Sequence, residues 1–225
     1  MRILRRLLAA LHMAWLYVAV AFWTATARLR LFVHGARVGR GLRVWGPIRL
    51  HCHPTSSIRI GDGCRIQSGF AGNPVGGSRR MALWLGPGAH LTLGNRVGLS
   101  NSTIVCMKSV AIEDDVFLGG GSQIYDTDFH SVRPDERGRP GNPGTRTRPV
   151  VLRARAFVGG HSTLLKGVTV GAEAVVGAGS VVRSDVPDRQ IWAGNPAAFV
   201  RDLSAGEHPA LPHREPVALR RAEAV

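Results

Sequence analysis

The sequence predicts an all-β fold: a left-handed parallel β-helix of six-residue repeats, with an N-terminal apolar helix and a short C-terminal extension. Two observations predict the β-helix, namely runs of apolar residues at six-residue intervals and, from Leu152 onward, a small or β-branched residue four places after each of them. A third observation predicts the helix, because residues 7–27 contain no Asp, Glu, Lys or Arg and are long enough to cross a bilayer.

The six-residue period is clearest in the C-terminal half of the chain. There the apolar positions are Leu152, Val158, Leu164, Val170, Val176 and Val182, followed four places later by Ala156, Ser162, Val168, Ala174, Ser180 and Val186. Earlier runs keep the same count: Val38, Val44 and Leu50; Ile60 and Ile66; Leu93, Leu99 and Val105; Ile112, Leu118 and Ile124. A helix would repeat every 3.6 residues and a half-buried strand every 2. We therefore expect short strands separated by turns, with three units to a coil and the apolar residues pointing inward.

Two interruptions and the two ends set the domain organisation. Residues 72–80 form a short Gly-rich excursion, and residues 131–149 form a longer one with four prolines and five arginines. A loop of that length inside a compact repeat is usually functional or disordered. We expect a basic and apolar segment at 1–34, the β-helix at 35–201 with its extruded loop at 131–149, and a tail at 202–225.

The charge is distributed unevenly along the chain. The formal net charge is +14, and no acidic residue precedes Asp62 although arginines are frequent before it. A one-sided basic region favours phosphate, and next to the apolar stretch 7–27 it predicts association with an anionic membrane surface. Trp15, Tyr17 and Trp23 are aromatic residues of the kind that favours the lipid headgroup region of a membrane. The alternative is a helix packed on its own protein or a partner, whereas the apolar character argues against nucleic acid.

The cysteines indicate the redox compartment, and one histidine interrupts the six-residue repeat. Three cysteines without a CxxC pair indicate a reducing compartment and argue against a disulfide framework or structural zinc. The six-residue step after Ile124 falls on His130, a polar side chain where a core aliphatic is expected. Asp126 and Asp128 lie just before it. Breaks of this kind gather at functional sites, although a histidine that merely caps the stack is the alternative.

Three features together resemble a known family. They are the six-residue repeats, the Asp-x-Asp-Phe-His element at 126–130, and the ending "DVPDRQIWAGNPAAFVR" at 185–201. Over residues 35–202 the chain resembles the hexapeptide-repeat acyltransferases, and among them the maltose, galactoside and colanic-acid O-acetyltransferases. The resemblance implies that His130 is a general base, which takes the proton of a sugar hydroxyl while the oxygen attacks an acyl-CoA thioester. Asp126 or Asp128 would orient its ring, and no covalent acyl-enzyme is needed.

The same resemblance implies further site residues and an assembly. Asn101 and Phe129 would lie near the acceptor, although Asn101 also suits a plain corner turn. Trp192 would either pack on the adenine or cover the last coil. The assembly would be a homotrimer with active sites at subunit junctions, and no metal is expected. The positions that match the acetyl-CoA groove are Gly160, Ala178, Arg183, Ser184 and Arg201.

The sequence thus predicts an acetyl-CoA-dependent O-acyltransferase that modifies a sugar hydroxyl during exopolysaccharide or glycolipid assembly, on the cytoplasmic face of the bacterial membrane. The arginines of 131–149 would recognise an anionic acceptor. One alternative is a non-catalytic, membrane-tethered β-helix scaffold. Another is a carbonic-anhydrase-like zinc enzyme on the same fold, for which His51, His53, His130 and His161 lack the expected ligand spacing.

Overall fold

A computed structural model describes residues 2–70 and 73–204 of the chain. Within these residues it contains one helix, α1 (Arg2–Val33), followed by twenty strands that form three sheets. Sheet A holds β1 (Arg37–Val38), β4 (Ser57–Ile60), β7 (His90–Leu93), β10 (Ser109–Ile112), β13 (Val150–Leu152) and β16 (Thr169–Val170). Sheet B holds β2 (Arg43–Trp45), β5 (Arg65–Gln67), β8 (Gly98–Ser100), β11 (Phe117–Leu118), β14 (Phe157–Val158), β17 (Val175–Val176), β19 (Gln190–Gly194) and β20 (Ala197–Asp202). Sheet C holds β3 (Arg49–Cys52), β6 (Ala82–Leu85), β9 (Thr103–Cys106), β12 (Gln123–Tyr125), β15 (Thr163–Leu164) and β18 (Val181–Val182).

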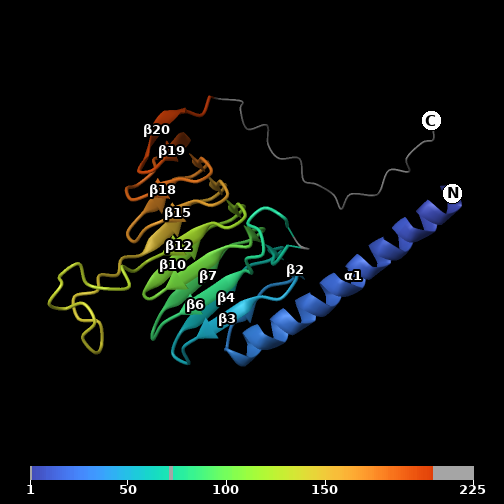
Figure 1. Ribbon diagram of the computed structural model, residues 1–225, viewed down its shortest axis with the longest axis horizontal. Coiled ribbons are helices and arrows are strands. Elements are labelled where there is room, and N and C mark those ends of the chain that lie inside the picture. Colours follow the sequence, from blue (N-terminus) through green and yellow to red (C-terminus); the bar gives the residue numbers. More distant parts are fainter. Residues whose placement is uncertain (1, 71–72, 205–225) are drawn as a thin grey trace.

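The three sheets form the faces of a prism, which confirms the predicted left-handed parallel β-helix (Figure 1). Each strand pairs in parallel with the strand one full coil later, as Ile112 of β10 does with Leu152 of β13. The chain therefore visits sheets A, B and C in turn and crosses three corners in every coil: A–B, B–C and C–A. Apolar side chains at the repeat positions fill the interior, where Val158, Leu164 and Val176 are fully buried.

The predicted register is wrong at one strand. Val105 was expected to point inward, but Ile104 and Cys106 of β9 are buried and Val105 faces outward. The preceding B–C corner is one residue shorter than the repeat allows, because Asn101 adopts a left-handed backbone with φ of 45° and turns the chain early. A one-residue slip exchanges the two faces of a strand, so Val105 joins the outer surface.

His130 does not occupy the core step that the repeat predicts for it. The chain leaves the prism after Tyr125, and the next inward position after Ile124 is Leu152 on β13. His130 lies on the excursion between them and is exposed. The expectation of a polar residue inside the stack is therefore wrong, because the insertion restarts the count after the loop.

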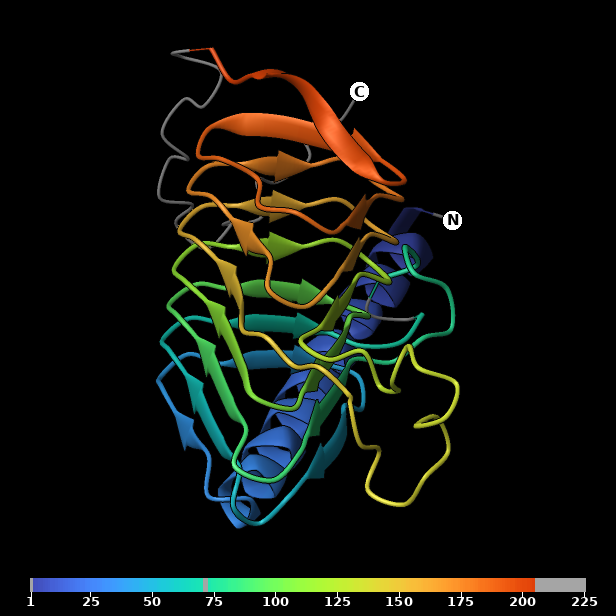
Figure 2. The ribbon, with the colours of Figure 1, turned by 90° about the vertical axis from the view of Figure 1, so that its left-hand side faces the viewer.

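Both excursions extend from corners that border sheet C. Residues 68–81 connect β5 to β6 at the B–C corner, and residues 126–149 connect β12 to β13 at the C–A corner. The longer loop thus begins five residues before the predicted start at 131. Figure 1 shows the two loops on opposite sides of the prism, and Figure 2 shows that both lie toward the same face of it.

The ends of the prism are closed differently. Trp23, Ala27 and Leu31, near the C-terminal end of α1, pack against the first coil, while the N-terminal part of the helix stands away from it (Figure 1). At the other end, β19 and β20 form an antiparallel pair, and Trp192 of β19 packs against the core. Of the predicted tail, residues 205–225 lie outside the described residues.

Candidate active site

Asp126 anchors the longer loop to the prism. Its buried carboxylate accepts the backbone N–H groups of Met107, Lys108 and Ser109 at 2.7, 2.6 and 2.9 Å. These three donors form the C–A corner of the preceding coil. A carboxylate that accepts several backbone N–H groups holds its position firmly. Asp126 therefore fixes the place where the chain leaves the prism, rather than reaching outward to a ring.

The base of the loop is a short antiparallel pairing closed by an ion pair. Thr127 and Thr147 form an isolated bridge, and the Asp128 N–H donates to the Arg146 carbonyl at 3.1 Å. The Asp128 carboxylate pairs with the ammonium of Lys166, which lies at the C–A corner of the next coil. Both side chains are largely buried, so this pair is screened less than an exposed one. It ties the exit of the loop to the coil beyond it.

Phe129 and His130 follow Asp128 directly in the chain, at the start of the loop. Phe129 has a positive φ of 65°, and its ring meets the Tyr125 ring edge to face at 5.1 Å. The His130 N–H donates to the Asp128 carbonyl at 2.8 Å, and its side chain is exposed. Within the described residues, neither Asp126 nor Asp128 makes an ion pair with the imidazole. The predicted histidine and carboxylates are therefore neighbours, but the carboxylates hold the loop instead of the ring.

The rest of the loop has its own internal structure. Ser131 is buried and its hydroxyl donates to Glu136 at 2.6 Å, while Arg133 also pairs with Glu136 at 3.3 Å. Gly144 packs so closely against this pair that an added Cβ would lie 1.9 Å from Glu136 Oε2. The arginines of the loop are thus partly engaged within it, and the segment after His130 folds back on itself.

Asn101 holds the shorter loop. Its buried amide accepts the Gly69 N–H at 2.7 Å and donates to the carbonyls of Asn73 and Val75 at 2.8 and 3.0 Å. The sequence reasoning placed Asn101 at the acceptor or in a corner turn. In the structure its side chain holds Gly69, Asn73 and Val75 at the B–C corner, and its backbone makes the tight turn.

The residues predicted for the coenzyme lie on two corners. Gly160 and Ala178 stack at the B–C corner, where a Cβ on the neighbouring Gly159 would lie 2.5 Å from the Ala178 nitrogen. Arg183 and Ser184 are exposed at the C–A corner, and Arg201 lies on β20 of sheet B. Along the strands of sheet C, the B–C corner is at the opposite end from the His130 loop. One chain therefore does not bring His130 together with the strip at Gly160 and Ala178.

The cysteines and the possible metal ligands limit the kinds of chemistry that the site can perform. Burial raises the pKa of the Cys106 thiol to about 12, with the Asp126 charge acting in the same direction. Burial also raises the pKa of Cys64 and Cys52. None of the three is a prepared thiolate nucleophile. Among the described residues, no three His, Cys, Asp or Glu side chains gather as a metal-ligand set.

Lys166 is a residue of this region that the sequence pattern does not predict. It is one of only two lysines in a chain otherwise rich in arginine, the other being Lys108. That rarity is a weak signal. The partnership with Asp128 joins positions far apart in the sequence across the inserted loop, and the repeat count alone does not bring them together.

Known proteins with similar sequences or structures share the hexapeptide-repeat architecture of this chain. A family model described as the hexapeptide repeat of succinyl-transferase matches residues 149–184. A hexapeptide-repeat-containing acetyltransferase from Vibrio cholerae, also crystallised with acetyl coenzyme A, is 27% identical, with a TM-score of 0.53 over 81% of this chain and 82% of that one. An N-acyltransferase from Bacillus cereus has a TM-score of 0.59 over 80% of this chain and 88% of that one, but at 17% identity it shows the fold alone. The class is the left-handed β-helix built of hexapeptide repeats.

Two relatives of known name are both galactoside O-acetyltransferases. The galactoside O-acetyltransferase of Escherichia coli is 27% identical over 128 residues, which are 54% of this chain and 61% of that one. The enzyme of the same name from Lactococcus lactis is 28% identical over 71% of this chain and 70% of that one. The chain thus spans somewhat less than two thirds of the Escherichia coli relative. These matches make the chain similar to acetyltransferases built of hexapeptide repeats.

Proposed function

We propose that the protein transfers an acetyl group from acetyl-CoA to a hydroxyl of a sugar-containing acceptor, with His130 as the general base. The observation that carries the proposal is the exposed His130 on a loop fixed at two points, by Asp126 to one coil and by Asp128 and Lys166 to the next. Its support from outside the chain is the likeness to galactoside O-acetyltransferases and to an acetyltransferase that binds acetyl-CoA.

The chemistry requires one base and no covalent intermediate. Neutral His130 removes the proton of the acceptor hydroxyl as its oxygen attacks the thioester carbonyl carbon. The tetrahedral intermediate then collapses, the carbon–sulfur bond breaks, and the imidazolium returns a proton to the departing thiolate. The raised thiol pKa of Cys106 supports direct transfer, because a protonated cysteine does not compete as a nucleophile. Asp128 and Lys166 act by positioning the loop.

A complete site would take parts from two chains of a homotrimer. The small residues Gly160 and Ala178 suit the close approach of a slender pantetheine arm, and they lie at the corner opposite to the His130 loop. Val75 of the shorter loop lies beside them, since a Cβ at Gly160 would be 3.5 Å from its side chain. Packing prisms side by side brings the loop corner of one chain next to the B–C corner of its neighbour. The guanidinium of Arg201, and that of Arg183, would then take coenzyme phosphates.

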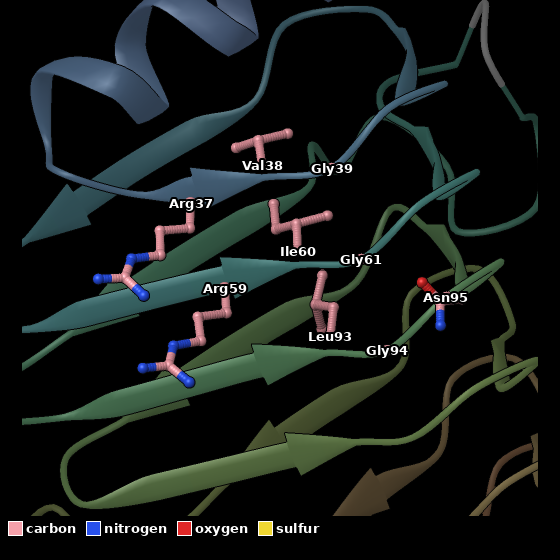
Figure 3. Close-up of a pocket in the computed structure, with 9 residues that line it drawn as sticks. All are labelled: Arg37, Val38, Gly39, Arg59, Ile60, Gly61, Leu93, Gly94 and Asn95. Carbon is pink, nitrogen blue, oxygen red and sulfur yellow. The ribbon is translucent and has the colours of Figure 1, made fainter.

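The proposed site of action is the cytoplasmic face of the membrane. The proposed acceptor is a glycolipid or an exopolysaccharide precursor. Helix α1 is long and apolar enough to cross a bilayer, and none of its most apolar stretch is buried. Arg37 and Arg59 on the first coils are direct partners across β1 and β4, and Figure 3 shows them extending in the same direction beside a hollow of about 480 Å³. Stacked like charges repel, and within the described residues neither has an acidic partner, which supports an anionic surface nearby.

The proposal is tested by release of free thiol from acetyl-CoA with a panel of free and lipid-linked sugars. His130→Ala should lower turnover by about 10² or more, the usual contribution of a general base. His34→Ala is the matched control, since His34 is an exposed histidine at the end of α1. Equal turnover in His130→Ala and wild type would refute the role of His130, and failure of the wild type to bind acetyl-CoA would refute the function.

A further inference from the structure

The outer face of sheet C carries a row of side chains in register. His51, Trp84, Val105 and Tyr125 are successive partners on β3, β6, β9 and β12. They face outward because the alternate positions, such as Leu83, point into the core. We name these four residues the sheet C row. Val105 belongs to it only because of the register slip at Asn101.

Trp84 is the unusual member of the row. Its indole is 51% exposed and stacks on the His51 ring with centroids 3.9 Å apart. Because His51 and Trp84 are partners on adjacent strands, the stack runs from coil to coil, and the indole stands out from the sheet with one face on His51 and the other toward the Val105 side. Tryptophan is normally highly buried, so an exposed indole in this position calls for a partner. The stack also fixes the plane of the indole, and a preorganised aromatic plane loses little entropy when a ligand lies on it.

The two loops border this row and join it to the candidate base. The loop 126–149 begins where β12 ends, and Phe129 places its ring against Tyr125, one residue from His130. The loop 68–81 ends where β6 begins, with the exposed pair Arg79 and Arg80. Figures 1 and 2 together show both loops toward the same face of the prism. The two loops therefore flank the outer face of sheet C at its two edges.

The side chains at the edge of the outer face of sheet C next to β6 carry positive charge. Burial raises the pKa of the Tyr125 phenol, and the positive charge of Arg79 acts in the opposite direction. Within the described residues neither Arg79 nor Arg80 has an acidic partner. Exposed guanidinium groups at the edge of a sheet face that carries aromatic rings favour a ligand that has both an apolar face and an anionic group.

We propose that the outer face of sheet C is the acceptor platform and that it binds a phosphorylated sugar, with the apolar face of the sugar ring on Trp84 and its phosphate at Arg79. The inference rests on the proposed function, because it takes the hydroxyl donor at His130 to be a sugar. It adds the class of acceptor and two residues that determine specificity. A sugar ring has the flat C–H face that an indole takes, and phosphate oxygens match the guanidinium fork.

The test measures binding of α-D-glucose 1-phosphate, α-D-galactose 1-phosphate and their neutral methyl glycosides to the full chain by ligand-observed NMR. Trp84→Ala should weaken binding of both sugar phosphates by roughly tenfold, as expected for one lost aromatic contact. Arg79→Gln should weaken the phosphates to the level of the neutral glycosides. The matched control is Phe157→Ala, which removes an aromatic ring of similar exposure, 44%, from sheet B and should change nothing.

Three results would overturn the platform: no binding of either sugar phosphate to the wild type, unchanged binding in Trp84→Ala, or an equal loss in Phe157→Ala. A change of oligomeric state in Trp84→Ala, seen by sedimentation, would also overturn it and show that the face is covered by a second copy of the chain. The assay contains no acetyl-CoA. Its failure is therefore distinguishable from failure of the proposed function, which is judged by acetyl-CoA binding and by the His130→Ala turnover.

Discussion

At the scale of single residues, the short element Asp126 to His130 divides into two aspartates that anchor the loop and a histidine that is exposed. Asp126 is buried among backbone N–H groups and Asp128 is paired with Lys166, while His130 is exposed. The spacing of the polar residues marks the region from sequence. Their roles do not follow from the spacing, because the donors to Asp126 and the partner of Asp128 come from neighbouring coils.

The anchoring role of Asp126 is measurable as stability. Asp126→Ala leaves three backbone N–H groups without their acceptor, so it should lower the free energy of unfolding by about 3 kcal/mol. Urea unfolding followed by circular dichroism measures this. Asp135→Ala is the control, since Asp135 is an exposed loop residue paired only with Arg133, and its loss should cost less than about 0.5 kcal/mol. Equal effects of the two changes would contradict the anchor.

The buried Cys106 thiol predicts a pH dependence. Its pKa is about 12 in the folded chain against an ordinary value of 9.0, so above pH 9 the folded chain keeps a proton that the unfolded chain has lost. The contribution of Cys106 to stability is therefore complete below pH 9 and declines as the pH rises toward 12. Unfolding free energies measured from pH 8 to 11 should fall more steeply for the wild type than for Cys106→Ala. Parallel profiles would show that the thiol titrates alike in both states.

At the scale of elements, the six-residue count predicts the strands and the order of the sheets, and it fails at two corners. The Asn101 turn is one residue short, and the chain leaves the coil after Tyr125 instead of continuing to His130. Both failures have the same cause. A repeat specifies what is inside while the chain stays on the prism, whereas a corner is closed by local turn geometry and by hydrogen bonds from other coils.

Helix α1 has two parts with different roles. Trp23, Ala27 and Leu31 belong to the core, whereas residues 2–22 stand away from the prism. A chain lacking residues 2–22 should therefore stay folded and lose binding to vesicles of phosphatidylglycerol and phosphatidylcholine in a flotation assay. The full chain with Arg2, Arg5 and Arg6 changed to Gln is the control. It should retain binding through the apolar face but with a weaker dependence on salt.

Continued flotation of the shortened chain would contradict the role of the helix and move membrane binding to the arginines of the first coils. Failure of the full chain to float would contradict membrane association altogether. The sequence predicted the helix from its composition. It did not predict that the last third of the helix would close the first coil, because that depends on how Leu31 meets the open end of the prism.

At the scale of the whole molecule, the candidate site is divided between two corners of one prism. His130 lies with the loop at the C–A corner, and the small residues Gly160 and Ala178 lie at the B–C corner. Their positions in the repeat are readable from the sequence, but their separation in space is visible only when the three faces are assembled. The separation is the main physical reason to expect that the working unit contains more than one chain.

The most direct test of this account is a mixing experiment with two variants. His130→Ala lacks the proposed base, and Ala178→Glu, at an exposed position, places a negative charge and added bulk in the proposed coenzyme strip at Gly160 and Ala178. Each alone should fail to release thiol from acetyl-CoA in the presence of an acceptor. Assembled together in equal amounts, they should recover activity at about one quarter of the wild-type level, because that share of the shared sites has both intact parts. A mixture no more active than either variant alone would show that each site is built within one chain and would contradict the account.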